Sequence, residues 1–201
     1  MNDAAAVREA IAGGIDLCGE NRVQELTQKQ KENAYDGVPV HFIGVLQTNK
    51  VKQVVGKVDV IQSVDRINLL QAIQKEAAKQ GIVQSIFLEV NVGGEESKSG
   101  FSVGEVLSLL EQIGEYPNIF VRGLMTIPPI SKKEGDNRKF FQEMLQLSVD
   151  IRAKKYDNVL VECLSMGMSD DFEDAIACGS NMIRIGTAIF GARDYTKLHQ
   201  K

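Results

Sequence analysis

Short apolar runs alternate with longer amphipathic stretches along the whole chain. The runs are rich in β-branched residues and mostly lack a strict alternation of apolar and polar positions, which is typical of strands covered by helices. This pattern predicts strands at 15–18, 40–43, 58–61, 85–92, 119–125, 160–164 and 182–185. We therefore expect a chain in which strands and helices follow one another in turn.

The stretches between these runs carry the start and stop signals of helices. Helices are predicted at 4–12, 65–80, 102–113 and 169–178, each followed by a glycine that favours a helix end. Asp65, Ser102 and Ser169 have short polar side chains suited to N-caps. A further charged helix, at 134–152, follows a loop with two adjacent prolines.

The count of elements leaves two architectures. Seven strands, each followed by a helix or helical turn, and one helix in front of the first strand are predicted. Such alternation without hairpins occurs in open doubly wound sheets and in closed (β/α)₈ barrels. A leading helix whose own strand is absent favours an α/β fold of the second kind, a (β/α)₈ TIM-type barrel lacking its first strand. An open sheet that begins with a helix would explain the same count.

Composition and charge narrow the class of protein. Of the 201 residues, 43% are hydrophobic and 25% are charged, with a net charge of -4, which fits a globular chain and favours no nucleic-acid partner. No apolar run approaches the roughly 20 residues of a membrane helix. Cys18, Cys163 and Cys178 are too widely spaced for a metal motif and fit a reducing compartment. We expect one domain over residues 1–201 in a cytoplasmic protein that binds neither nucleic acid nor membrane.

Candidate chemistry lies just beyond the carboxyl ends of the strands, where functional residues gather in both architectures. After the last predicted strand, Arg184 supplies a positive charge, Gly186 lets a ligand approach the backbone, and Thr187 begins a helix. Backbone N–H groups and a hydroxyl at a helix start can bind an anion. A glycine turn with a capping threonine is the structural alternative. Ser165 and Gly167, at the end of the preceding strand, are candidates to complete a phosphate cradle with this turn.

Earlier strand ends add further candidates. Asn21 and Asn49 have short polar side chains that could fix a polar ligand. His41 lies within a predicted strand, where a lone histidine is more often a hydrogen-bonded core residue than a catalyst. Met125 is, in the same way, more often part of the packing than a ligand floor.

Motifs for other kinds of chemistry are absent. The sequence contains no GxxxxGK[ST], no GxGxxG after a strand, no HExxH and no GxSxG. The second histidine, His199, lies in the terminal tail, and Asp170 and Asp171 are interpreted as helix-dipole partners rather than a metal site. The residues alone indicate a barrel that binds a small phosphorylated ligand and no metal.

Several motifs carry a family resemblance: GENRVQE at 19–25, HFIGVLQTNK at 41–50, GLM at 123–125, and the two segments at 165–171 and 184–191. In this order, over essentially the whole chain, they resemble the pyridoxal phosphate homeostasis protein family, which is related to the N-terminal barrel of alanine racemases. The resemblance implies a barrel that binds pyridoxal 5′-phosphate without a known enzymatic reaction and buffers or delivers this cofactor in the cell. It implies that the cofactor contacts Ser165, Gly186 and Thr187 through its phosphate, lies beside Arg184, and is lined by Asn21, Asn49 and Met125.

The lysine that binds the cofactor in that family has no counterpart among these motifs. The family holds its cofactor through an imine to a lysine at the end of the first strand, whereas Met1 lies where the first barrel helix starts. We interpret the chain as an N-terminally truncated member and expect non-covalent binding of pyridoxal 5′-phosphate at best. Lys50 and Lys98 are interpreted as solvated or anion-contacting side chains. Family members are monomers, but open sheet edges beside the missing strand could let this chain associate.

The alternative is an enzyme, either a pyridoxal-phosphate-dependent racemase-like barrel or a phosphosugar-type barrel. A racemase of this lineage needs a second acid/base residue from an additional domain, and only residues 192–201 follow the last predicted helical turn. A phosphosugar enzyme would want carboxylates, lysines or histidines at strand ends where this sequence has mainly Asn, Ser and Gly. The resemblance therefore favours a binding protein that is not an enzyme.

Overall fold

Seven parallel strands form one sheet in the computed structural model, which describes residues 2–95, 97–130, 133 and 135–191. The strands pair strictly in chain order. They are β1 (Cys18–Glu20), β2 (Val40–Phe42), β3 (Val60–Val64), β4 (Gln84–Glu89), β5 (Ile119–Met125), β6 (Val159–Met168) and β7 (Met182–Arg184). A doubly wound open sheet reverses its strand order, and this sheet does not. The predicted barrel architecture is confirmed, and the open-sheet alternative is wrong.

A helix or 3₁₀ turn follows each strand, as the alternating pattern predicts. These elements are α1 (Ala4–Ala12), α2 (Val23–Lys31), η1 (Thr48–Gln53), α3 (Ile67–Gln80), α4 (Val103–Glu111), η2 (Ile113–Glu115), α5 (Arg138–Lys154), α6 (Phe172–Ala177) and α7 (Thr187–Phe190). The exception is α1, which precedes the first strand, β1. Among the helices of the described residues, none is long and apolar enough to cross a membrane.

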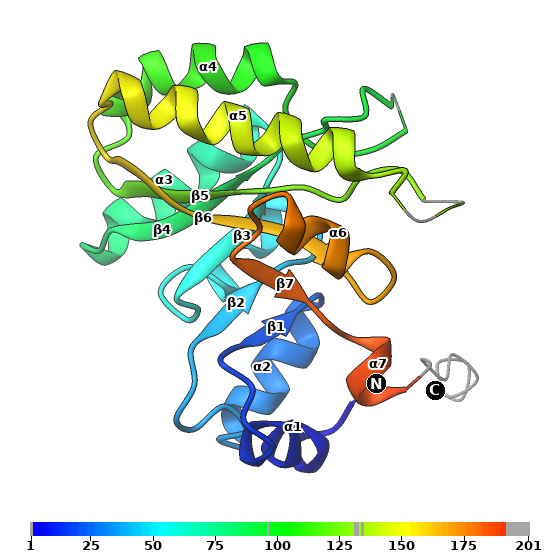
Figure 1. Ribbon diagram of the computed structural model, residues 1–201. Helices are drawn as coiled ribbons and strands as arrows, with labels where there is room; N and C mark the ends of the chain where they lie inside the picture. Colours follow the sequence, from blue (N-terminus) through cyan, green and yellow to red (C-terminus); the bar gives the residue numbers. More distant parts are fainter. Residues whose placement is uncertain (1, 96, 131–132, 134, 192–201) are drawn as a thin grey trace.

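The sheet curls into a nearly closed barrel. Its two end strands, β1 and β7, lie near each other in Figure 1, but in the described part of the chain no ladder joins them. Near this gap lies a cavity of about 310 Å³, lined by Asn2, by Ala6, Glu9 and Ala10 of α1, and by Ile189 and Phe190 of α7. The expected count of seven strands is thus confirmed, with an open edge on each side of the gap.

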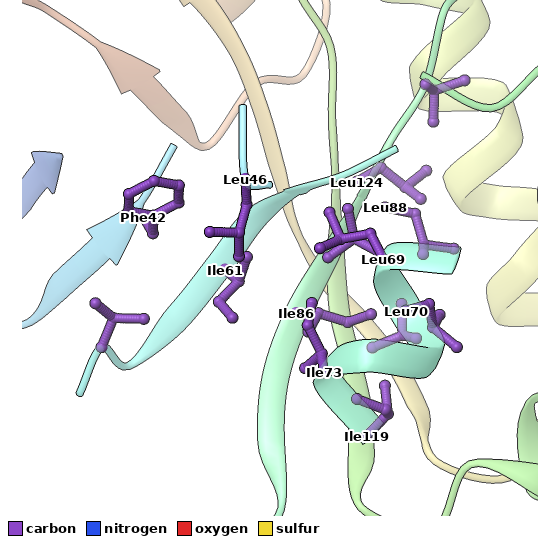
Figure 2. Packing of buried hydrophobic residues seen from close by; sticks show 14 of the residues in the cluster. Phe42, Leu46, Ile61, Leu69, Leu70, Ile73, Ile86, Leu88, Ile119 and Leu124 are labelled. Atoms are coloured by element: carbon purple, nitrogen blue, oxygen red, sulfur yellow. The ribbon is translucent and has the colours of Figure 1, made fainter. Parts of the chain in front are cut away.

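The main core lies between the sheet and the surrounding helices. In β4, Ile86 and Leu88 are fully buried on the helix side, where Figure 2 shows them beside Leu69, Leu70 and Ile73 of α3. Burying one such side chain stabilises the fold by about 1.5–3 kcal/mol. The glycine at the end of α3, Gly81, adopts a left-handed conformation (φ 66°) that stops the helix where the sequence predicts.

A smaller apolar cluster fills the inside of the barrel. Val60, Phe87 and Met125 are buried there, with Cys163 and Met182 packed against them. Gly123 makes room for this cluster, because a Cβ at this position would lie 2.9 Å from the Phe87 ring and 2.5 Å from the carbonyl oxygen of Cys163. Alternation along β4 therefore sends Phe87 into the barrel and its two neighbours to the helix layer.

Of the three predicted N-caps, one is confirmed. The Ser102 hydroxyl accepts from the backbone N–H of Glu105, and the Glu105 carboxylate accepts from the backbone N–H of Ser102, which forms a capping box. Ser169 is not a cap, because α6 begins three residues later, at Phe172. Asp65 is not a cap either, since its carboxylate pairs with Arg66, the residue that precedes α3.

Several predicted boundaries shift by a few residues. The first strand is Cys18–Glu20 instead of 15–18, because it pairs in register with β2 and Cys18 lies opposite Val40. β4 ends at Glu89, since Val90 makes only an isolated bridge to Phe101. The charged helix starts at Arg138; its predicted start, Glu134, and the tail with His199 lie outside the described residues.

Candidate functional site

Arg184 places a fixed positive charge at the carboxyl end of β7. Its Nη1 donates to the carbonyl oxygen of Ser165 at 2.8 Å and to the Ser165 Oγ at 2.7 Å. Its Nη2 donates to the carbonyl oxygen of Thr126 at 2.8 Å. Burial lowers the pKa of Arg184 to about 10, so the guanidinium stays charged at neutral pH. Three hydrogen bonds thus hold a cation against the ends of β5 and β6.

Behind this arginine, a buried chain of hydrogen bonds crosses the barrel interior. The Ser165 Oγ donates to Oε1 of Gln62 at 2.7 Å, and Nε2 of Gln62 lies 2.7 Å from Nδ1 of His41. Because a carboxamide nitrogen only donates, Nδ1 of His41 accepts this bond. Burial lowers the pKa of His41 to about 4, so the ring is neutral near pH 7. Each hydrogen bond in this series is therefore donated in the same direction, from Arg184 on β7 towards His41 on β2.

These hydrogen bonds give Ser165 a different position from the one expected of a residue that contacts the ligand directly. Its side chain is fully buried, and its hydroxyl is engaged with Arg184 and Gln62. The hydroxyl that lies beside Thr187 belongs instead to Ser169, at 3.1 Å between the two oxygens. The sequence predicts Ser169 only as a helix cap, although its place one residue past β6 makes it a strand-end residue as well.

Gly186 and Thr187 follow β7 as the sequence predicts. A Cβ at Gly186 would meet no atom within 4 Å, so the space in front of this backbone is open. The helix that Thr187 begins is only four residues long. Few aligned peptide groups stand behind such a start, so hydroxyls, backbone N–H groups and Arg184 supply most of the attraction for an anion.

The remaining predicted residues lie at different depths. Met125, the last residue of β5, is buried in the apolar cluster inside the barrel. Asn21 follows β1 and lines a cavity of about 240 Å³ together with Arg22, Val23, Gln24, Val45, Gln47 and Lys50. Asn49 is exposed in η1 and is not among the residues that line this cavity. The structure thus brings Met125, Ser165 and Arg184 together, and no contact joins the two asparagines to them among the described residues.

Sequence reasoning missed Glu89, the last residue of β4. Its Cα pairs in register with that of Met125, and its side chain is only 8% exposed. Burial, with a smaller contribution from the nearby Asp65, raises the pKa of Glu89 to about 7. Counting two residues on from the inward-facing Phe87 would have identified Glu89 as a residue of the barrel mouth.

Lysines and metal ligands are not part of the strand ends that the structure describes. Lys50 lies in η1, and Lys98 donates to the carbonyl oxygen of Pro128 at 2.8 Å and pairs with Glu95 at 2.8 Å. Among the described residues there is no cluster of three or more histidine, cysteine or carboxylate side chains that could hold a metal ion. The chemistry offered at the mouth therefore includes the guanidinium of Arg184, several hydroxyls and the buried carboxyl group of Glu89.

This protein is a parallel α/β barrel in which a hydrogen-bonded guanidinium and hydroxyl groups lie at the ends of the last two strands. It therefore belongs to the class of barrels suited to small anionic ligands. Comparison with known proteins identifies the family within this class. The family model described as "Alanine racemase, N-terminal domain" matches residues 2–194. The pyridoxal phosphate homeostasis protein of Aquifex aeolicus is 47% identical over 94% of this chain and 82% of its own length.

Two solved structures of PipY from Synechococcus elongatus share the fold. The structure without pyridoxal phosphate has a TM-score of 0.87 at 32% identity, and the one with pyridoxal phosphate bound has 0.84 at 31%. Each comparison covers 94% of this chain and 88% of the PipY chain. The chain belongs to the pyridoxal phosphate homeostasis proteins of the alanine racemase N-terminal domain family, which confirms the resemblance carried by its motifs.

Proposed function

We propose that this chain binds pyridoxal 5′-phosphate at the barrel mouth, catalyses no reaction on it, and serves the intracellular homeostasis of this cofactor in the cytoplasm. The guanidinium of Arg184 carries the proposal, because three hydrogen bonds hold it beside the open backbone that follows β7. The names of the relatives and the bound cofactor in PipY support the same ligand.

The residues present fit a phosphate monoester. Ser169 and Thr187 bring two hydroxyls within 3.1 Å of each other, and Gly186 leaves open space beside them. A phosphate oxygen accepts hydrogen bonds from such hydroxyls and from backbone N–H groups. Because Met168 pairs in register with Arg184, these groups lie at matching ends of β6 and β7.

The other residues have supporting roles in this proposal. In this proposal Arg184 lies beside the bound cofactor, and Met125, Asn21 and Asn49 line its pocket. Ser165 acts through Arg184, since its hydroxyl and carbonyl oxygens both accept from the guanidinium. The cofactor supplies an electrophilic aldehyde, and the protein residues bind it and orient it.

We expect non-covalent binding by residues 1–201. The inward-facing strand positions of the described chain are occupied by residues such as His41, Gln62, Phe87 and Arg184, and none of these positions carries a lysine. Phosphate and ring contacts without a covalent bond give a complex that dialysis can reverse.

A titration with pyridoxal 5′-phosphate, followed by absorbance and equilibrium dialysis, tests the proposal. Gly186→Ala places a methyl group in the open space and should weaken binding about tenfold or more, which corresponds to roughly 1.4 kcal/mol. Gly104→Ala is the matched control, because a Cβ there also meets nothing within 4 Å but lies on α4. Equal affinities of the two variants, or no saturable binding to the wild type, would contradict the proposed site. A cofactor fixed to a lysine by borohydride would overturn non-covalent binding.

An enzyme of the racemase-like or phosphosugar type is the second candidate, and the near-neutral pKa of Glu89 is the observation that favours it. A carboxyl group that exchanges its proton near pH 7 is suited to acid/base catalysis. Assays of alanine racemisation and of phosphosugar turnover, with wild type and Glu89→Gln compared, separate the candidates. Turnover that disappears in the variant would favour the enzyme.

A further inference from the structure

Glu89 sits in the wall of the barrel mouth, on the same level as residues of the proposed cofactor site. Its Cα pairs with that of Met125 on β5, and Met125 in turn pairs with Ser165 on β6. Phe87, two positions earlier on β4, is part of the apolar cluster inside the barrel, whereas Leu88 packs in the helix layer. Alternation along the strand therefore directs the Glu89 side chain inward.

The carboxyl group of Glu89 lacks a partner of its own. Within the part of the chain that the structure describes, it makes no hydrogen bond or ion pair, although the residue is only 8% exposed. Glu20 shows the usual arrangement for comparison, because the carboxylate of this residue, which is also buried, accepts from Nζ of Lys29 at 2.6 Å and from the Tyr35 hydroxyl at 2.9 Å. A buried carboxylate without such partners is costly, and a proton or a ligand donor relieves that cost.

The charged groups around Glu89 come from two other parts of the fold, the connection between β3 and α3 and the end of β7. Asp65 follows β3, Arg66 precedes α3, and Arg184 ends β7. Arg66 is engaged by Asp65 and by the carbonyl oxygen of Leu46, and Arg184 is engaged by oxygens of Ser165 and Thr126. Both arginines favour the ionised form of Glu89, whereas burial and Asp65 oppose it more strongly.

In the loop that follows β4, the described residues Glu95 and Lys98 neutralise each other. They pair at 2.8 Å, and the Lys98 amine also donates to the carbonyl oxygen of Pro128. Cys163 and Asp171 are further neighbours of Arg184, and burial raises the pKa of the Cys163 thiol, which is therefore neutral near pH 7. The pKa of Glu89, about 7, thus lets the charge of this residue change near neutral pH.

We propose that Glu89 takes up a proton from solvent when an anionic ligand binds beside Arg184, so that the protein binds this ligand more tightly as the pH falls. The inference rests on the proposed function and names a residue that controls the same site. A phosphate dianion brings negative charge close to the carboxylate, and both share the guanidinium of Arg184. Protonation removes the repulsion and turns the carboxyl group into a hydrogen-bond donor that the ligand can use. At most one proton enters per ligand bound.

Calorimetry in buffers of different ionisation enthalpy tests this proton uptake between pH 6 and 8.5. Two probes are titrated into the full chain: pyridoxal 5′-phosphate, and sulfate, whose charge is constant over this range. Above pH 7 the wild type should lose up to about tenfold in affinity for each pH unit and take up to one proton. Glu89→Gln, which keeps the size of the side chain without its charge, should show neither effect with sulfate. Glu111→Gln, an exposed carboxylate on α4, is the control and should behave as the wild type.

The outcomes separate this inference from the proposed function. If Glu89→Gln retains the proton uptake and the pH dependence of the wild type, the inference is overturned while cofactor binding stands. If neither protein binds pyridoxal 5′-phosphate at any pH, both are overturned. As a second measurement, independent of the stability of the variant, the pKa of Glu89 is followed by carboxyl-carbon NMR in the wild type. Sulfate should raise this pKa, and an unchanged or lowered value would contradict the proposal.

Discussion

The Ser165 hydroxyl donates to Oε1 of Gln62 at 2.7 Å, and this bond joins β6 to β3 across the inside of the barrel. The amide nitrogen of Gln62 donates to Nδ1 of His41, while the Ser165 hydroxyl oxygen accepts from Arg184. Each member of the chain thereby fixes the next, and the orientation of the guanidinium depends on residues from three other strands. The site is built from the interior of the barrel as well as from its rim.

Replacing Gln62 by Leu should destabilise the protein strongly. The variant leaves the Ser165 hydroxyl without an acceptor for its proton and Nδ1 of His41 without its donor, which costs about 1–3 kcal/mol for each group. Urea unfolding at pH 7 measures the loss. Gln146→Leu, at an exposed position on α5 with a hydrogen bond to Asp150, is the control and should change little. If Gln62→Leu unfolds at the same urea concentration as the wild type, the hydrogen bonds of Gln62 do not stabilise the folded state.

His41 should make the folded state sensitive to acid. Its pKa in the folded state, about 4, lies below the ordinary value of 6.5, because burial disfavours the charged ring. The unfolded chain therefore takes up a proton first as the pH falls from 6.5 to 4. Stability present above pH 6.5 is lost across this window, by up to about 3 kcal/mol. Unfolding free energies of wild type and His41→Asn measured against pH give the contribution, and parallel curves would refute it.

Glu89 should act on stability in the opposite direction. Its folded-state pKa, about 7, lies above the ordinary value of 4.5, mainly because of burial. Its contribution is fully present below pH 4.5 and is lost as the pH rises through 7. Glu89→Gln should therefore stabilise the protein at pH 8 by up to about 3 kcal/mol and have little effect at pH 4. Thermal unfolding at both pH values measures this, and an equal shift at each pH would contradict it.

The ion pair between Glu20 and Lys29 should be sensitive to the removal of one partner. The two residues are 5% and 7% exposed, and their charged atoms are 2.6 Å apart. Lys29→Ala leaves a buried carboxylate without its cation, at an expected cost of about 3–5 kcal/mol. The double variant Glu20→Gln with Lys29→Met should recover part of this loss.

A matched control for that pair exists on the surface. Lys79 pairs with Glu76 at 3.9 Å, and Lys79 is largely exposed. Lys79→Ala should change the free energy of unfolding by less than about 1 kcal/mol. Equal effects of Lys79→Ala and Lys29→Ala in urea unfolding would show that burial does not strengthen the inner pair.

Gly44 should tolerate no side chain. A Cβ at this position would lie 2.1 Å from the carbonyl oxygen of Asn21, a backbone atom of the neighbouring strand end. Gly44→Ala should therefore cost about 3 kcal/mol or more, since the backbone must move. Gly104→Ala, at an open helical position, should instead stabilise the protein by about 0.5–1 kcal/mol. Expression yield and melting temperature of the two variants provide the comparison.

Local patterns in the sequence were enough to predict the seven strands and the alternation of strands with helical segments. The stop of α3 at Gly81 and the capping box of Ser102 with Glu105 depend on residues a few positions apart, so they can be identified without knowledge of the fold. The strand Ile119–Met125 was predicted with its observed bounds. The strand-end position of Arg184, Gly186 and Thr187 follows from the same reasoning.

Only the tertiary structure decided which strand-end side chains meet. The registers of β5 with β6 and of β6 with β7 both shift along their length, so counting from the sequence does not show which hydroxyl faces the site. In the folded protein the Ser165 hydroxyl bonds to Gln62 and Arg184 inside the barrel, and the Ser169 hydroxyl lies beside that of Thr187. Hydrophobic periodicity records only whether a position is buried. The partners of a buried polar group, and hence its pKa, depend on strands far away in the sequence that barrel closure brings near.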